Sequence, residues 1–274
     1  LKQKNNINRI KFLYESLIDL DSRFKDKFEF SLLILNGSSE DIFDKLLGSD
    51  LLNISEIFTD YSNKPDDVKN VNKLKRILAN NPSVKLQLIS EVNSLTNIEE
   101  VVNQENFKPP KTMKDMEKLF SNLYPKDEDG FYSIDEPLDL PESSKPIAKN
   151  YPEVVENYLF DIEKELSMLK EDSKSYFKGG ESEALLRLEK KVSSEEEYIR
   201  NFRKPRTTST NKPENPLEPE TTGLSPYLSF GCLSPRLLWK ETEKCYRNGD
   251  HTQPPESMHG QLMFREMFYI LSRA

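Results

Sequence analysis

The chain has 274 residues, of which 35% are hydrophobic and 31% are charged, so it holds enough apolar material for a packed core. Its 39 basic and 47 acidic residues give a net charge of −8, which argues against a generally basic nucleic-acid binder, because such affinity depends on phosphate contacts. No stretch approaches the roughly 18 apolar residues that span a bilayer, and two cysteines cannot build a disulfide framework or a four-thiolate zinc site.

The first part of the chain alternates between helical and strand patterns. Apolar residues at helical spacing predict helices over 7–24, 38–49 and 67–81. Short apolar or alternating runs predict strands over 28–37, 53–61 and 84–92. Because strands and helices alternate at this spacing, we expect a parallel sheet with right-handed crossovers.

The composition of the sequence changes after about residue 104. A Pro-Pro break and a short helix lead into 124–152, which is rich in proline, acidic residues and serine and is predicted to be a long surface connection. A helix is predicted over 153–171, and the stretch 178–274 is predicted to be helical and compact. Within that stretch, 205–221 is expected to form a polar loop, and the sequence closes on a strongly apolar helix.

Few residues point to enzyme chemistry. His251 and His259 are the two histidines, and their spacing from acids and thiols suggests neither a catalytic triad nor a metal cage, so we interpret both as surface loop residues. The chain has no GxGxxG motif and no P-loop, which disfavours a nicotinamide enzyme or an NTPase.

The hydroxyl-rich turn Thr221–Ser225 has a different character. Its glycine permits close approach of a ligand to the backbone, and its hydroxyls and backbone N–H groups would suit a phosphate. An ordinary capped helix start has the same pattern, so the pattern alone leaves both interpretations open.

Three segments carry a family resemblance. GGESEALLRLE (179–189), TGLSPYLSFGCLSPR (222–236) and HGQLMFREMFYIL (259–271) occur in this order and closely resemble the flavin-binding domain of the cryptochrome/photolyase family, in its animal-type cryptochrome or (6-4) photolyase branch. NRIKFLYESLIDLDSRF (8–24) resembles the amino-terminal α/β domain of the same family.

The resemblance implies a domain organisation. We expect an incomplete, Rossmann-like α/β domain with a parallel sheet over 1–105, and a linker with short helices over 106–177. The N-terminal half of an all-α FAD-binding domain would follow over 178–274. Because the sequence begins at Leu1 and a strongly apolar helix runs into its last residues, we expect truncation at both ends. No apolar segment follows a basic start, so we expect no signal peptide.

The resemblance also implies that FAD is the cofactor. Its diphosphate would lie on the turn, Gln261 would face the flavin, Arg265 would lie on the same helix face, and Tyr198 would stand near the cofactor. The implied FAD-binding residues are Tyr198, Thr222, Gly223, Leu224, Ser225, Gln261 and Arg265. Without the resemblance, Gln261 would be a surface amide and Arg265 would pair with Glu266 or another acid.

The family's function is implied with alternatives. Phe264 stands where the family usually has a tryptophan, and this difference favours blue-light signalling and circadian transcriptional regulation. For such a protein the resemblance implies a location in nucleus and cytoplasm, clock or transcription-regulator proteins as partners, and no membrane. The first alternative is a (6-4) photolyase-type repair enzyme, a deoxyribodipyrimidine lyase that binds DNA through a cationic rim. The rim would draw on Arg200, Arg203, Lys204, Arg206 and Lys212. The second alternative is a flavin-free interaction protein on the same scaffold.

Overall fold

The computed structural model divides the chain into two compact units. The first unit comprises 1–90 and 140–173, and the second comprises 91–139 and 174–274. The structure describes residues 7–28, 31–62, 65–90, 92–137, 151–169, 175–206, 211–212, 215 and 217–274. Part of the predicted surface connection, 138–150, and part of the predicted polar loop, 207–210, lie outside the described residues.

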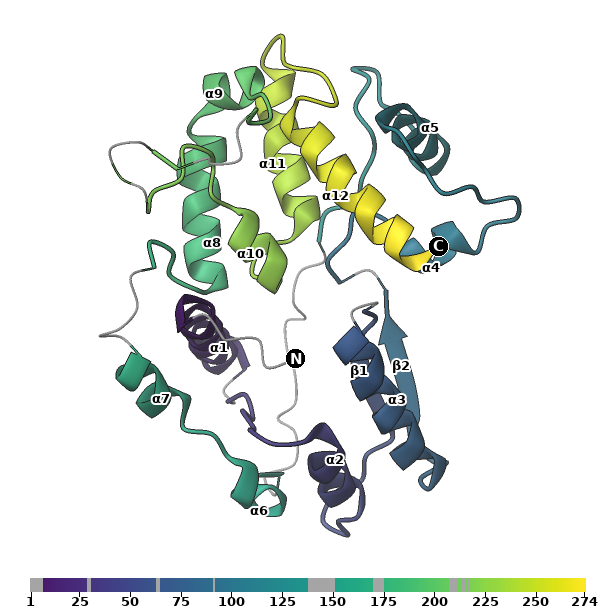
Figure 1. Ribbon diagram of the computed structural model, residues 1–274, viewed down its shortest axis with the longest axis vertical. Helices are drawn as coiled ribbons and strands as arrows, with labels where there is room; N and C mark the ends of the chain where they lie inside the picture. Colours follow the sequence, from purple (N-terminus) through teal and green to yellow (C-terminus); the bar gives the residue numbers. More distant parts are fainter. Residues whose placement is uncertain are drawn as a thin grey trace. The chain divides into compact units, whose positions relative to one another are not determined.

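The first unit contains a two-stranded parallel sheet. Strands β1 (Glu56–Asp60) and β2 (Lys85–Ile89) pair in register from Glu56 opposite Lys85, and helix α3 (Pro65–Ala79) connects them (Figure 1). This confirms the predicted strand–helix–strand order. Parallel neighbours need a long crossover, and the helix provides it.

Helices α1 (Ile7–Phe28), α2 (Ser39–Leu47) and α7 (Ile162–Leu169) pack in pairs within the first unit or against its crossover helix. Helix α1 packs against α7, and α2 packs against α3. Ile42 and Leu46 of α2 form a buried cluster with Val155, surrounded by half-buried aliphatic and aromatic side chains. The apolar spacing that predicted α1 and α2 therefore corresponds to real packing faces.

Two predictions in the first unit are wrong. The described part of 28–37 forms no regular strand, and the helix predicted over 153–171 is divided into α6 (Tyr151–Val154), η1 (Glu156–Tyr158) and α7. Both differences come from one isolated antiparallel bridge between Leu35 and Leu159. The Asn36 N–H donates to Tyr158, and the Phe160 N–H donates to Ile34, so these backbone groups are not available to a continuous helix.

The second unit is helical in its described residues. Its elements are α4 (Ile98–Val102), α5 (Met113–Leu123), α8 (Glu181–Leu188), the π-helical turn η2 (Glu189–Ser193), α9 (Glu196–Asn201), α10 (Ser225–Phe230), α11 (Pro235–Arg247) and α12 (Met258–Arg273). Ser234 and Ser257 cap the N-termini of α11 and α12, because each hydroxyl accepts a hydrogen bond from a first-turn N–H.

Helices α11 and α12 lie side by side and carry much of the second unit's core (Figure 1). Trp239, Tyr227, Phe120 and Met263 are among its fully buried side chains. The sheet-bearing unit and the helical unit together confirm the predicted fold class of an α/β domain beside an all-α domain. The predicted domain boundaries at 105/106 and 177/178 stay predictions. In the described residues, no helix is both long and apolar enough to cross a membrane.

Candidate functional site

One cavity of the second unit brings the predicted turn and helix together. We call it the turn cavity: it has a volume of 240 Å³ and is bounded by the 221–225 turn and the first half of α12. Six of the seven predicted residues line it, namely Thr222, Gly223, Leu224, Ser225, Gln261 and Arg265. Apolar side chains such as Phe202, Leu238 and Leu262 form much of the remaining wall.

Glycine is required at position 223. Its φ of +64° lies in the left-handed region, and a Cβ there would stand 2.5 Å from Nη2 of Arg187 and 2.8 Å from Cγ of Pro219. A larger residue would therefore strain the backbone and collide with its neighbours. The turn can adopt this conformation because glycine has no Cβ, which leaves the space at position 223 to Arg187 and Pro219.

Arg187 supports the turn and was missed by the sequence analysis. Its Nε donates to the carbonyl oxygen of Thr222 at 2.7 Å, and its guanidinium lies 5.4 Å from the Tyr176 ring and 5.2 Å from the Phe177 ring. Nη2 of Arg187 is buried and has no hydrogen-bond partner in the described residues. No spacing pattern connects residue 187 with residue 222, so only the tertiary structure identifies this contact.

Gln261 and Arg265 line the cavity while they hold the surrounding backbone. Nε2 of Gln261 donates to the Pro255 carbonyl at 2.9 Å. Nη1 of Arg265 donates to the Asn93 carbonyl at 2.9 Å, and its guanidinium lies 4.6 Å from the Tyr269 ring. Nη2 of Arg265 also donates to the Tyr269 hydroxyl at 3.3 Å and to the Leu228 carbonyl at 3.5 Å. Contacts within the protein therefore position both side chains at the cavity wall.

Arg265 and Glu266 form no ion pair in the part of the chain that the structure describes, because Glu266 faces a different partner, although the positive charge of Arg265 still acts on its carboxylate. Its buried carboxylate accepts hydrogen bonds from the N–H of Leu95, the N–H of Thr96 and the Thr96 hydroxyl, at 2.6 to 3.0 Å. Burial raises the pKa of Glu266 above its ordinary value, although these bonds act in the opposite direction. Adjacent residues of α12 therefore fix the 93–96 segment from two sides.

Tyr198 stands apart from the other predicted residues. Its side chain is 40% exposed and does not line the turn cavity, although its ring meets Phe202 of the cavity wall edge-on, with centroids 6.2 Å apart. Burial, followed by the charge of Glu220, raises the pKa of its phenol. Its role near a cofactor stays a prediction.

The interpretation of both histidines as surface loop residues is wrong for His259. This residue belongs to α12, is 6% exposed and stacks on Trp239 with ring centroids 3.6 Å apart. Its Nε2 lies 3.0 Å from the Trp239 carbonyl oxygen, to which it donates. Burial lowers the pKa of His259 to about 3, so its ring is neutral at physiological pH. Among the described residues, no group of three His, Cys, Asp or Glu side chains is arranged to hold a metal.

Comparisons with known proteins show what the chain as a whole is similar to. A family model described as DNA photolyase matches residues 2–129. Cryptochrome-1 of Spalax judaei is 30% identical over 275 residues, which cover 96% of this chain and 42% of that protein. The chain is thus similar to cryptochromes and photolyases over nearly its whole length. Cryptochrome-2 of Gallus gallus, another family member, is 29% identical and is covered to 43% of its length.

Solved structures of the family show the same fold. A cryptochrome from Synechocystis matches 98% of this chain and 51% of its own, with a TM-score of 0.62 and 18% identity. A class III photolyase from Agrobacterium tumefaciens matches 96% of this chain and 50% of its own, with a TM-score of 0.57 and 19% identity. The chain therefore spans about two fifths of the length of the curated relatives and about half of the length of these solved structures. The comparisons confirm the predicted resemblance.

Proposed function

We propose that this chain binds FAD and contributes to a blue-light signalling protein of the cryptochrome type. One observation carries the proposal: two segments far apart in the sequence, 222–225 and 261–265, line a single cavity. A similar photolyase, from Sulfolobus tokodaii, is described as containing two FAD molecules. When bound, FAD supplies blue-light absorption and accepts an electron.

The residues of the turn fit a diphosphate. Nη2 of Arg187 is a buried cationic N–H donor without a partner in the described residues, and it lies beside Gly223. Leaving such a donor unpaired is costly, and an anionic oxygen is the partner that suits it best. Arg187 lies behind the turn and does not line the turn cavity; the donors that line it are the hydroxyls of Thr222 and Ser225 and the guanidinium of Arg265.

The size of the turn cavity limits what it holds. Small-molecule sites commonly occupy about 300 to 1,000 Å³. At 240 Å³ the turn cavity is smaller than that range. We therefore assign the diphosphate portion of FAD to it and leave the isoalloxazine ring to other parts of the intact protein.

The binding test uses flavin fluorescence anisotropy with the purified chain. We expect FAD to bind and riboflavin, which lacks the diphosphate, to bind far more weakly. Ser225→Ala should weaken FAD binding about tenfold, because a hydrogen bond to a charged group contributes about 1.5–3 kcal/mol. Ser229→Ala is the matched control, since Ser229 is also exposed on α10 but does not line the cavity.

Equal binding of FAD and riboflavin, or equal effects of the two serine variants, would contradict the diphosphate assignment. Absence of any flavin binding would favour the flavin-free interaction protein. That result would not affect the similarity to cryptochromes and photolyases, because the similarity rests on the comparisons.

Signalling is favoured over DNA repair by the charges of the cationic residues predicted for a DNA-binding rim. Of the five cationic residues predicted for a DNA-binding rim, three lie beside carboxylates: Lys204 at 3.2 Å from Glu256, Lys212 at 2.6 Å from Glu218, and Arg200 at 3.8 Å from Glu196. These pairs reduce the positive field available to phosphates. We therefore propose circadian transcriptional regulation in nucleus and cytoplasm, with clock or transcription-regulator proteins as partners.

The repair alternative is tested by titrating duplex DNA that contains a (6-4) photoproduct at several salt concentrations. A signalling protein should bind weakly, with a shallow dependence of log affinity on log salt. A steep dependence together with preference for the damaged duplex would establish the repair alternative, because several phosphate contacts release several counterions.

A further inference from the structure

Arg187 faces the turn from outside the turn cavity. It lies in the last turn of α8, and its side chain is half-buried. Its Nε donates to the Thr222 carbonyl oxygen at 2.7 Å, and a Cβ on Gly223 would stand 2.5 Å from its Nη2. Thr222 and Gly223 line the turn cavity, whereas Arg187 does not. The peptide group between these two turn residues therefore separates Arg187 from the cavity.

Aromatic contacts hold the Arg187 guanidinium in this position. It lies 5.4 Å from the Tyr176 ring centroid and 5.2 Å from that of Phe177. The Phe177 ring meets the Tyr227 ring edge-on with centroids 6.3 Å apart, and the Tyr227 hydroxyl donates to the Lys178 carbonyl oxygen at 2.9 Å. Tyr227 is buried and belongs to α10, which begins at the end of the turn. The guanidinium and the turn are thus held by one packed set of side chains.

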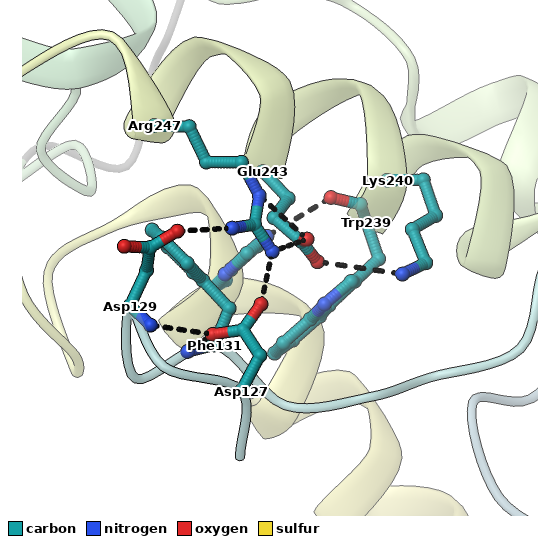
Figure 2. Close-up of polar contacts among 8 residues, drawn as sticks. Asp127, Asp129, Phe131, Trp239, Lys240, Glu243 and Arg247 are labelled. Atoms are coloured by element: carbon teal, nitrogen blue, oxygen red, sulfur yellow. Dashed lines mark hydrogen bonds and ion pairs between the residues drawn. The ribbon is translucent and has the colours of Figure 1, made fainter.

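The charge of Arg187 is not compensated by a carboxylate, unlike that of Arg247. Figure 2 shows the Arg247 guanidinium between Asp127, Asp129 and Glu243; it donates to Asp129 at 2.7 Å and also binds Asp127 and Glu243. Arg187 forms no ion pair in the part of the chain that the structure describes, and its buried Nη2 has no hydrogen-bond partner there. A positive charge behind the turn favours an anion on the other side of it.

The hydrogen bond from Arg187 also fixes the direction of a backbone donor. The Thr222–Gly223 peptide bond is trans, so its C=O and N–H bonds point in opposite directions. Since the carbonyl oxygen binds Arg187, the Gly223 N–H points away from Arg187. Among the described residues this N–H has no acceptor. An unpaired backbone N–H at a cavity wall is a donor for a ligand.

Glycine alone does not determine this direction. Gly223 has a φ of +64°, but glycine adopts positive and negative φ about equally well. The peptide group before it can therefore rotate and present either its N–H or its carbonyl oxygen to the cavity. A carbonyl oxygen in the cavity would repel an anion, because it carries a partial negative charge. A contact from outside the cavity is needed to select the N–H.

We propose that Arg187 is a positioning residue for the diphosphate site. It holds the Thr222 carbonyl oxygen outside the turn cavity and thereby directs the Gly223 N–H into it, as a donor to an anionic phosphate oxygen. This role rests on the proposed function, because it concerns how the same cavity is prepared for a diphosphate. Arg187 itself acts from behind the turn and does not contact the ligand.

NMR can observe this one peptide group separately. Thr222–Gly223 is the only Thr-Gly pair in the sequence. Isotopic labelling of threonine carbonyl carbons and glycine nitrogens therefore gives one signal in a spectrum that correlates each amide with the preceding carbonyl. Inorganic pyrophosphate should move the Gly223 proton shift downfield, as a hydrogen bond to an anionic oxygen does. Arg187→Met should move the Thr222 carbonyl shift upfield without ligand and abolish the response to pyrophosphate.

Variants separate this role from a general loss of stability. Arg187→Met should weaken FAD binding about tenfold in the anisotropy titration. Arg236→Met is the matched control, because Arg236 is also half-buried and its Nε donates to the Ser94 carbonyl oxygen at 3.3 Å, but it does not line the turn cavity. The control should leave both the FAD affinity and the Gly223 signal unchanged. If Arg187→Met does not fold, Arg187→Lys replaces it, and its Thr222 carbonyl shift and FAD affinity should change together.

The proposal is overturned if FAD binds the unmodified chain while pyrophosphate leaves the Gly223 signal in place. It is also overturned if the Arg187 and Arg236 variants weaken FAD binding equally, or if an Arg187 variant displaces the Thr222 carbonyl signal at full FAD affinity. These results do not affect the diphosphate assignment, which the Ser225 and Ser229 variants test. A chain that binds neither FAD nor pyrophosphate contradicts the proposed function itself, and the role of Arg187 with it.

Discussion

At the scale of single residues, Gly223 and Arg187 show how closely the turn cavity is packed. Arg187 holds the Thr222 carbonyl, and the missing side chain at Gly223 leaves room for the guanidinium. The shape of the turn thus depends on one contact between residues 35 positions apart in the sequence. This contact also places an unpaired N–H donor beside the cavity wall.

Gly223→Ala is expected to destabilise the chain by more than Gly231→Ala. Both glycines have left-handed φ values, so each substitution should cost about 1–2 kcal/mol of backbone strain. At Gly231 nothing lies within 4 Å of the new Cβ, whereas at Gly223 the Cβ would meet Arg187 and Pro219. The collision should add about 1–3 kcal/mol, measurable by urea unfolding. An equal decrease in the free energy of unfolding for the two variants would show that Arg187 and Pro219 move away from the new Cβ at no cost.

His259 is expected to make stability depend on pH. Its pKa is lowered from 6.5 to about 3 in the folded chain, so below pH 6.5 the unfolded chain binds a proton that the folded chain does not. Stability is therefore fully present above pH 6.5 and falls with decreasing pH, by up to about 1.4 kcal/mol per pH unit.

The measurement is urea unfolding followed between about pH 4.5 and pH 7.5, with His259→Gln as the comparison. The variant should show a shallower dependence on pH, because it lacks the titrating ring. Parallel curves for the two proteins would mean that His259 is protonated in the folded chain.

At the scale of secondary-structure elements, α12 contributes both to the turn cavity and to the core. It places Gln261 and Arg265 at the wall of the turn cavity, whereas His259 and Met263 are buried in the core. Its start is fixed by Ser257, which is buried and whose hydroxyl accepts a hydrogen bond from the Gly260 N–H at 3.1 Å. The register of these four residues follows from this start.

Ser257→Ala should lower the free energy of unfolding by about 1 kcal/mol, because it removes an N-cap and leaves a buried N–H without its partner. Ser272→Ala, in the last turn of the same helix, should change it by less than about 0.5 kcal/mol. Thermal and urea unfolding of the two variants would measure the difference. If the Ser257 variant were as stable as the Ser272 variant, packing alone, and not the N-cap hydrogen bond, would fix the N-terminus of α12.

At the scale of the whole molecule, the two units differ in the means by which each is stabilised. The first unit has a sheet of two strands and a small buried cluster, and isolated two-stranded sheets are marginally stable. The second unit holds large, fully buried side chains, including Trp239, Tyr227 and Phe120. Burial of apolar area is the main stabilising contribution, so the second unit should be the more stable one.

We therefore expect two unfolding transitions. Far-UV circular dichroism reports helices of both units, whereas the fluorescence of Trp239 reports the second unit, which contains the only tryptophan. The dichroism signal should begin to decrease at a lower urea concentration than the concentration at which the fluorescence signal begins to change. Coincident curves would show instead that the two units unfold as one cooperative structure.

The sequence determined the elements whose signals are local. Apolar periodicity predicted α1, α3 and the two paired strands, and the resemblance of 179–189, 222–236 and 259–271 predicted the family. The resemblance also implies that the turn residues and Gln261 contact FAD. They line one cavity, and their contact with FAD stays a prediction. Periodicity and capping depend on neighbours within a few positions, so the sequence records them directly.

Only the tertiary structure decided the features that join distant positions. The bridge between Leu35 and Leu159 replaced a predicted strand and divided a predicted helix, because backbone groups pair with whichever segment lies beside them. The contact of Arg187 with Thr222, the burial of His259 against Trp239 and the clamp of Arg247 on Asp127 and Asp129 arise in the same way. Hydrogen bonds and ring stacking act over a few ångströms in space, whereas sequence patterns describe order along the chain.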